Sequence, residues 1–267
     1  MEMNNIHPTA IVSSKAELGK NITVGPYSII NDNVKINDNC NLISHVNIDG
    51  FTTIGNDCTF YPFCSIGTIP QDLKYKGEKS TLTVGKFNVF REYVTVNPGT
   101  KGGGLKTIIG DNCLLMVGSH VAHDCKIGSS VILVNNASLA GHVVLEDYSI
   151  LGAFSGVHQF CRIGKHAMIG AMSGVDSDVI PYGTVLGNRA YLSGLNIIGL
   201  KRRGFSKPII QELRKAYGLL FFTQDRTIST RIKEVSEEFS NNEPVMEVVN
   251  FLTKEKSRSL CKPKDVG

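Results

Sequence analysis

Residues 109–133, IGDNCLLMVGSHVAHDCKIGSSVIL, carry a large aliphatic side chain at every sixth position. The series consists of Ile109, Leu115, Val121, Ile127 and Leu133. A period of six is longer than the two-residue alternation of a strand and does not match the 3.6 residues of a helical turn. The stretch therefore predicts a short strand followed by a corner, repeated as one face of a coil.

The same period extends over most of the chain, roughly residues 6–190. Its further members are Val12, Leu18, Val24, Ile30, Ile36, Leu42, Ile48, Ile54, Phe60, Ile66, Val84, Phe90 and Val96 upstream, and Leu139, Leu145, Leu151, Val157, Ile163, Ile169 and Val175 downstream. Two segments interrupt it, residues 68–83 and 97–108, and both are polar and rich in glycine or lysine. We expect these segments to be loops that leave the coil, and loops on rigid scaffolds often carry binding groups.

Two other positions of the six-residue unit are also restricted. The residue after the aliphatic is often glycine, as in Gly25 and Gly128, which we interpret as a tight turn or a positive φ. The fourth residue after it is small or β-branched, and six of the seven cysteines stand there: Cys40, Cys58, Cys64, Cys113, Cys125 and Cys161. We interpret these cysteines as small buried apolar residues rather than as disulfides or metal ligands.

This pattern resembles the hexapeptide-repeat acyltransferase superfamily, whose members wind into a left-handed parallel β-helix of triangular cross-section. Handedness comes from that resemblance alone, because parallel connections are usually right-handed and periodicity does not overturn that rule. The expected fold class is mostly β, a left-handed parallel β-helix over residues 1–194 with extruded loops at 68–83 and 97–108. A small helical domain is expected over residues 195–267.

The helical expectation rests on the segment that follows the last six-residue units. SKPIIQELRKAYGLLFF has Ser206 as a candidate N-cap, Pro208 early, and apolar residues near helical spacing. TISTRIKEVSEEF and EPVMEVVNFLTKE predict two more helices. We expect their apolar faces to pack on one another and on the last coil.

Composition limits the classes of partner and location. The chain has 267 residues and a formal net charge of +4, too small and too dispersed for a nucleic-acid binder. The N-terminus, MEMNNIHPTA, lacks the cationic start and apolar core of a signal peptide, and no apolar run approaches the ~20 residues that span a bilayer. We expect a cytoplasmic protein without a membrane span.

Coil geometry gathers polar residues that are distant in sequence. Residues one turn apart, about 18 positions, stack about 4.8 Å from each other along the axis. His123, Gly141 and Gln159 therefore form one column, with His142 and His158 one step to either side. Asp124 beside His123 would fix its tautomer, and the bare Gly141 amide would suit a developing oxyanion.

The strings QDLKY, SHVAHDC, NNASLAGHV, VHQFC and GLKRRGFS, in this order and followed by a helical tail, resemble the UDP-N-acetylglucosamine acyltransferase family. The resemblance runs essentially from end to end. It implies transfer of a (3R)-3-hydroxyacyl group from acyl carrier protein to the 3-hydroxyl of UDP-GlcNAc, the first step of lipid A synthesis. It also implies a homotrimer with sites between neighbouring prisms, and neither a metal nor a cofactor beyond the phosphopantetheine arm of the carrier.

The resemblance also implies roles for individual residues. The general base falls on His123, its orienting carboxylate on Asp124 and the oxyanion donor on the Gly141 amide. The residues that match substrate-binding positions are Gln71, Asp72, Lys74, His120, His142, His158, Gln159, Asn196, Arg202 and Arg203. Arginine suits the pyrophosphate of the nucleotide because its donors form a fixed fork.

Two positions depart from the family pattern. Arg189 stands where the family often has histidine, which would alter a base or phosphate contact without affecting the chemistry. Ala171 falls on the position that sets acyl length, where glycine admits a long chain and a bulky residue a shorter one. The preferred chain length is therefore left open by the sequence.

Three other interpretations stay open at this point. Gamma-class carbonic anhydrases are also left-handed β-helices and bind zinc through three histidines. A related N-acyltransferase of the same pathway acts on an amino sugar, but it normally has a separate N-terminal domain before its coils, and the same base would serve a 3-amino as well as a 3-hydroxyl acceptor. The third interpretation is a β-helix with a structural role only. It is disfavoured because it does not explain why the histidine column and the loops occur together.

Overall fold

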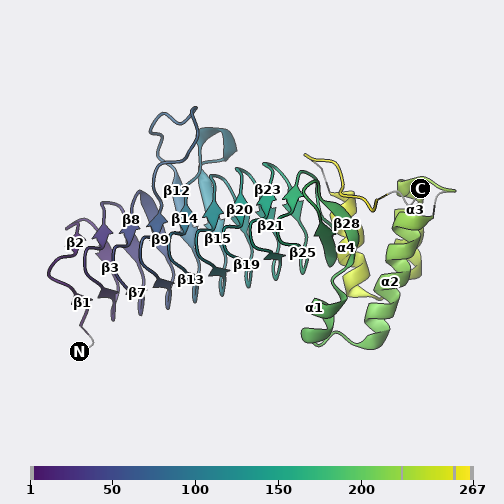
Figure 1. The fold of residues 1–267 in the computed structure, drawn as a ribbon, viewed down its shortest axis with the longest axis horizontal. Coiled ribbons are helices and arrows are strands. Elements are labelled where there is room, and N and C mark those ends of the chain that lie inside the picture. The colour runs from purple at the N-terminus through teal and green to yellow at the C-terminus, as the bar shows by residue number, and fades with distance from the viewer. Residues whose placement is uncertain (1–2, 224, 255–256, 265–267) are drawn as a thin grey trace.

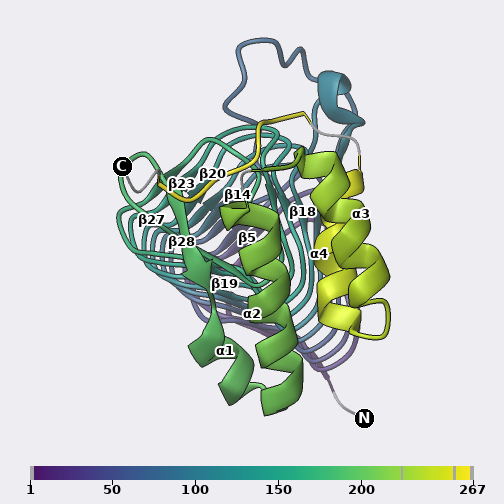
Figure 2. The same cartoon turned by 90° about the vertical axis from the view of Figure 1, so that its right-hand side faces the viewer.

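The chain forms a long three-sided parallel β-helix that ends in a group of helices (Figure 1). This computed structural model describes residues 3–223, 225–254 and 257–264. The expected fold class is confirmed, a mostly β, left-handed β-helix with a C-terminal helical domain. Figure 2 looks along the coils and shows the helices at one end of the prism.

Each member of the six-residue series is the last residue of a strand. Val121, for example, ends the strand His120–Val121 and is fully buried, while His120 faces outward and is partly exposed. Short strands are stable here because every strand inside a sheet pairs on both sides, as β17 does with β14 and β20 in the neighbouring coils. The aliphatic series thus becomes a single hydrophobic core along the axis of the coil.

Within the described residues, the strands form three sheets of 11, 9 and 8 strands. The first sheet contains β1 (Asn5–Ile6), β4 (Thr23–Val24), β7 (Asn41–Leu42), β10 (Thr59–Phe60), β13 (Val89–Phe90), β16 (Leu114–Leu115), β19 (Ile132–Leu133), β22 (Ile150–Leu151), β25 (Met168–Ile169), β27 (Gly183–Leu186) and β28 (Tyr191–Leu195). The second contains β2 (Ile11–Val12), β5 (Ile29–Ile30), β8 (Asn47–Ile48), β11 (Ser65–Ile66), β14 (Thr95–Val96), β17 (His120–Val121), β20 (Ser138–Leu139), β23 (Gly156–Val157) and β26 (Gly174–Val175). The third contains β3 (Glu17–Leu18), β6 (Lys35–Ile36), β9 (Phe51–Ile54), β12 (Thr81–Val84), β15 (Lys106–Ile109), β18 (Lys126–Ile127), β21 (Val144–Leu145) and β24 (Arg162–Ile163).

Both interruptions of the series are loops at the same edge of the prism, between strands of the second and third sheets (Figure 1). They end earlier than expected, at residues 80 and 105 instead of 83 and 108. Thr81–Val84 and Lys106–Ile109 are four-residue strands that pair with each other, and Thr81–Val84 also pairs with β9. The strands that follow the two loops begin early because the alternation of buried and partly exposed residues continues upstream of the six-residue position. In Thr81–Val84, both Leu82 and Val84 point into the core.

Most glycines that follow the aliphatic residues, including Gly25 and Gly128, do not have positive φ, which corrects that part of the sequence interpretation; Gly67, after Ile66, is an exception with a φ of 78°. They are needed because adjacent coils approach closely: a Cβ on Gly25 would lie 1.7 Å from the carbonyl oxygen of Ile43 in the next coil. Positive φ occurs two residues later, at corner positions that include Tyr27, Asp124 and His142. These non-glycine residues adopt the left-handed conformation because the corner must turn there.

The six cysteines of the repeat are core residues, as the sequence predicts. All seven are free and buried. Burial raises the pKa of Cys64 and of Cys125 to about 12, so both stay protonated at neutral pH. They therefore contribute packing rather than reactivity.

The C-terminal helices are α1 (Ile197–Arg202), α2 (Lys207–Phe222), α3 (Ile228–Glu238) and α4 (Glu243–Thr253). The last three match the predicted helices, although Glu255, at the end of the third predicted segment, lies outside the described residues. Ser206 is the N-cap residue of α2 but its side chain makes no capping hydrogen bond. Neither α1 nor the antiparallel β27–β28 hairpin was expected.

The helices are attached to the last coils by packing and by polar contacts. Phe251 and Leu252 of α4 are buried in the same core cluster as the β-helix. The Lys165 ammonium contacts the Glu247 carboxylate of α4 at 2.5 Å, and the Arg162 guanidinium lies 4.3 Å from the Phe251 ring centroid. None of the helices in the described part of the chain is long and apolar enough to cross a bilayer.

Candidate active site

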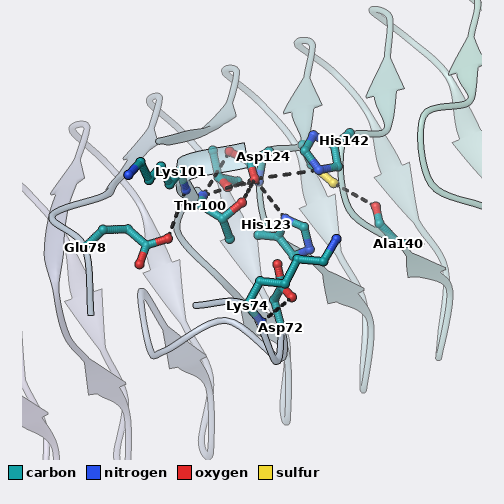
Figure 3. A network of polar contacts seen from close by, with 11 residues as sticks. Asp72, Lys74, Glu78, Thr100, Lys101, His123, Asp124, Ala140 and His142 are labelled. Carbon is teal, nitrogen blue, oxygen red and sulfur yellow. Dashed lines mark hydrogen bonds and ion pairs between the residues drawn. The ribbon is translucent and has the colours of Figure 1, made fainter. Parts of the chain in front are cut away.

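The candidate site lies at the edge between the second and third sheets, which we call the His123 edge. It consists of the turns that leave second-sheet strands and enter third-sheet strands. His123 and Asp124 stand in the turn between β17 and β18, and both loops, residues 67–80 and 97–105, leave this same edge. Figure 3 shows the loop residues gathered around His123 and Asp124.

His123 and Asp124 form a hydrogen-bonded dyad. His123 Nδ1 lies 2.8 Å from Asp124 Oδ2. Because an ionised carboxylate only accepts, Nδ1 carries the proton and Nε2 keeps its lone pair. The Asp124 side chain is fully buried, whereas the His123 side chain is 15% exposed, so the imidazole is the member of the pair that solvent or a ligand reaches.

Gly141 lies directly against the His123 ring, one coil further along. A Cβ at position 141 would be 2.5 Å from Cε1 and 2.7 Å from Nε2 of His123. Residue 141 stands two positions after the aliphatic residue of its repeat, where other coils have Pro26 and Pro62. Proline has no backbone N–H, so hydrogen bonding between coils does not require an N–H at this position. Among the hydrogen bonds of the described residues, none uses the Gly141 N–H. A donor is therefore available next to the imidazole.

Two further histidines border the dyad. His120 Nδ1 lies 2.7 Å from Thr95 Oγ1, and burial lowers the pKa of His120. The His142 ring stacks on Phe160 and meets the His123 ring edge-on, with centroids 5.1 Å apart. Burial also lowers the pKa of His142 below its ordinary value of 6.5, although Asp124 opposes the shift. Both are thus neutral at neutral pH, where they serve as hydrogen-bonding groups rather than as charges.

The donor atoms of His123, Asp124 and His142 lie within 4.8 Å of one another, which makes this cluster the candidate for a metal ion. The hydrogen bonds of Asp124 argue against that use. Its Oδ2 already accepts from His123 Nδ1, Thr100 N and Thr100 Oγ1, and its Oδ1 also accepts from Thr100 N. Oδ2, the oxygen that faces both histidines, therefore has no lone pair left for a cation held between them. The geometry fits an acid–base dyad better than a zinc centre.

The remaining residues expected at this edge are only partly gathered there. The first loop carries Asp72, which points toward the dyad, with Lys74 beside it and Gln71 exposed (Figure 3). Asp72 Oδ1 accepts from the Lys74 backbone N–H at 2.9 Å. His158 and Gln159 are on the same edge two coils from His123, but His158 does not join the cluster. Its Nδ1 accepts from Arg258 at 2.8 Å instead.

Four expected residues lie at other edges of this chain. Ala171 is exposed in the turn from the first to the second sheet, which we call the Ala171 edge. Asn196 and Arg203 lie at the third edge, between the third and first sheets, where both contact His166. The Asn196 carboxamide caps α1. Because the Arg203 guanidinium contacts His166, Arg202 is the one of these residues that presents an exposed guanidinium at this edge. Arg189 is exposed in the β27–β28 turn.

Sequence reasoning missed the contacts made by loop residues and by the C-terminal segment. Thr100 holds Asp124, Glu78 joins the two loops, and Arg258 binds His158. The glycines of NPGTKGGGLKT were the one available signal, because closely spaced glycines indicate a backbone that approaches something closely. Nothing periodic in the sequence identifies Arg258.

Comparison with known proteins shows related chains over nearly the whole length of this one. A family model described as "Udp N-acetylglucosamine O-acyltransferase; Domain 2" matches residues 178–261, and a bacterial transferase hexapeptide model matches residues 106–141. The acyl-[acyl-carrier-protein]–UDP-N-acetylglucosamine O-acyltransferase of Thermodesulfovibrio yellowstonii is 48% identical over 261 residues, covering 97% of this chain and 100% of that protein. The enzyme of the same name from Rickettsia canadensis is 50% identical over 261 residues, with 98% of both chains covered.

Solved structures agree over the whole chain, helical domain included. A crystal structure of a UDP-N-acetylglucosamine acyltransferase superimposes with a TM-score of 0.93 at 41% identity, covering 98% of this chain and 100% of that one. The UDP-N-acetylglucosamine acyltransferase of Francisella novicida gives a TM-score of 0.92 at 36% identity, covering 97% and 95%. With this coverage and identity, and with the His–Asp dyad at the edge where the loops emerge, the chain belongs to the UDP-N-acetylglucosamine O-acyltransferase family.

Proposed function

We propose that this protein transfers a (3R)-3-hydroxyacyl chain from acyl carrier protein to the 3-hydroxyl of UDP-GlcNAc, the first step of lipid A biosynthesis. The observation that carries the proposal is the buried His123–Asp124 pair with an accessible imidazole, in a chain whose relatives are named for this reaction. Their names specify O-acyl transfer, which favours the hydroxyl over the amino acceptor.

In the proposed reaction, His123 Nε2 removes the proton of the sugar hydroxyl as the oxygen attacks the thioester carbonyl carbon. The C=O electron pair moves onto oxygen, and the Gly141 N–H donates to that oxyanion. Collapse of the intermediate breaks the C–S bond, and the imidazolium returns the proton to the departing thiolate. Asp124 stays ionised throughout and stabilises the imidazolium through the 2.8 Å contact.

Substrate contacts follow from what surrounds the dyad. Asp72, Lys74 and Gln71 of the first loop would bind the sugar nucleotide, and His120 and His142 would hydrogen-bond the sugar or acyl chain as neutral imidazoles. His158 and Gln159 would continue this surface along the edge. The proposed reaction needs no metal or cofactor beyond the phosphopantetheine arm of the carrier protein, and we propose that it takes place in the cytoplasm.

A homotrimer is proposed because the expected substrate residues occupy all three edges of one prism. His123, Ala171 and Arg202 of one chain face different directions. A single site for the acyl chain and the nucleotide that uses all three residues cannot be built from one chain. A neighbouring copy must supply the residues that face away from the site in the first chain.

We expect shared sites to restore activity when two defective chains are mixed. Chains with His123→Ala and chains with Arg202→Ala, each weakly active alone, should regain up to about a quarter of wild-type activity when co-assembled at random, since a quarter of the sites would then combine both intact residues. The measurement is the acyl-transfer rate of the co-expressed mixture. Activity no higher than that of the separate variants would contradict a shared site.

The acyl-length position gives a second test, run with UDP-GlcNAc and hydroxyacyl carrier proteins of graded length. Ala171→Gly is expected to lengthen the preferred chain and Ala171→Met to shorten it, because each methylene excluded from an apolar groove costs about 0.8 kcal/mol, or roughly fourfold in kcat/KM. Wild-type transfer in this assay tests the proposed function itself. An identical length profile in all three proteins would show that Ala171 does not line the groove.

A further inference from the structure

We propose that the loop of residues 97–105 is a clamp that positions the Asp124 carboxylate, with Thr100 as its positioning residue. We call these residues the clamp loop. The inference rests on the proposed function, since it assigns to Thr100 the orientation of the carboxylate that in turn orients His123. Among the hydrogen bonds of the described residues, those that Thr100 makes to the dyad go to Asp124 and none goes to His123, so Thr100 acts through Asp124 (Figure 3).

The first observation is the number of hydrogen bonds that the clamp loop makes to one carboxylate. The Thr100 backbone N–H lies 3.0 Å from both Asp124 oxygens, and its Oγ1 donates to Oδ2 at 2.6 Å. Thr107, just beyond the loop, accepts from the Asp124 backbone N–H at 2.8 Å. These contacts hold the carboxylate plane, and with it the Oδ2 atom that meets His123 Nδ1.

The second observation is the closeness of the loop backbone to the same group. A Cβ on Gly103 would lie 2.0 Å from Asp124 Cγ, and one on Gly99 would lie 2.8 Å from Asp124 Oδ1. Only residues without a side chain fit there. Because the clamp loop packs against it so closely, the Asp124 side chain is fully buried although it stands at a corner of the prism.

Burial and donors act together on the chemistry. A carboxylate at a corner position would ordinarily be hydrated, and water would compete with it for the Nδ1 proton of His123. The clamp loop replaces that water with two donors on one residue, and in such a dry site the interaction of a carboxylate with an imidazolium is strongest. Loss of the clamp is therefore expected to affect the chemical step more than binding of the acceptor.

The third observation joins the clamp to the substrate loop. Glu78 of the first loop accepts from the Lys101 backbone N–H at 3.0 Å, next to Thr100. The same first loop carries Asp72 and Lys74. The loop proposed to bind the nucleotide and the loop that holds Asp124 are thus in direct contact.

Neighbouring glycines provide a matched pair of variants. Gly102 has nothing within 4 Å of its Cβ position, and neither Gly102 nor Gly103 has a φ that excludes alanine. Gly103→Ala is expected to lower kcat by about ten- to a hundredfold while KM for UDP-GlcNAc changes less than about twofold, because the methyl displaces the carboxylate and not the acceptor. Gly102→Ala is expected to match the wild type.

A second pair keeps the test valid if Gly103→Ala does not fold. Thr100→Val removes the hydroxyl donor but keeps the backbone N–H and the shape, so kcat should fall about tenfold or more with KM retained. Thr100→Ser restores the donor and should recover most of that loss. The proposal is overturned if Thr100→Val keeps wild-type kcat, if serine fails to rescue it, or if KM rises as much as kcat falls. Failure of the wild type to transfer acyl groups would instead overturn the proposed function.

Discussion

His123→Ala is expected to reduce kcat for acyl transfer by about 10²- to 10⁴-fold, the usual contribution of a positioned general base. His123 is the accessible member of the dyad, with Nδ1 bound to a buried carboxylate and Nε2 left with its lone pair. Removing the imidazole leaves no group at that position to accept the hydroxyl proton. Its partly exposed location at a turn, outside the hydrophobic core, means that the fold should persist.

The measurement is single-turnover and steady-state transfer from a hydroxyacyl carrier protein, with circular dichroism and hydrodynamic mass to confirm the folded assembly. His7→Ala is the control, because His7 is an exposed histidine in the first coil that contacts only Thr9 through its side chain among the described hydrogen bonds. Wild-type turnover in His123→Ala would remove His123 from the role of base. Loss of activity on chelation, with stoichiometric zinc by elemental analysis, would favour the metal-dependent alternative.

Gly141→Ala is expected to lower kcat by about 10²-fold, because a misplacement of about 1 Å in a catalytic group has an effect of that size. The added methyl would lie 2.5 Å from Cε1 of His123, too close for the ring to keep its position. It would also crowd the space above the Gly141 N–H, the proposed oxyanion donor. The φ of Gly141 does not exclude alanine, so we expect the backbone to remain intact.

Gly156→Ala is the matched control for this variant. Gly156 lies at the start of β23, in the coil after Gly141, and nothing lies within 4 Å of its Cβ position. Both variants should unfold at similar temperatures, and only Gly141→Ala should lose turnover. Equal activity in the two variants would mean that the His123 ring has room to move without consequence.

The sequence predicted the dyad well because its members depend on local spacing and on one period. His123 and Asp124 are adjacent, and Gly141 stands one coil from His123, so the stacking of coils alone brings them together. The same reasoning placed His158 on the correct edge but did not predict its hydrogen bond with Arg258. Stacking determines the height and edge of a residue, but the partner of an exposed side chain depends on segments that return from far along the chain.

The glycines of the repeat show the same limit of prediction from the sequence. Its recurrence after the aliphatic residues was visible in the sequence, but the choice between positive φ and close approach was not. The structure decides for close approach at Gly25, since a Cβ there would overlap the carbonyl of Ile43. That contact is between coils, and a pattern within one coil does not contain it.

The sequence by itself determined the repeating coil, the burial of the cysteines in the repeat and the column in which His123 lies, and its resemblance to hexapeptide-repeat proteins implied the three-sided cross-section. These features repeat, so each coil imposes the same pairing on the next one. Only the tertiary structure decided that the clamp loop covers Asp124, that Glu78 joins the two loops, and that Ala171 and Arg202 face edges other than that of His123. Loop residues belong to no repeat, and their conformation is determined by whichever distant groups satisfy their hydrogen bonds.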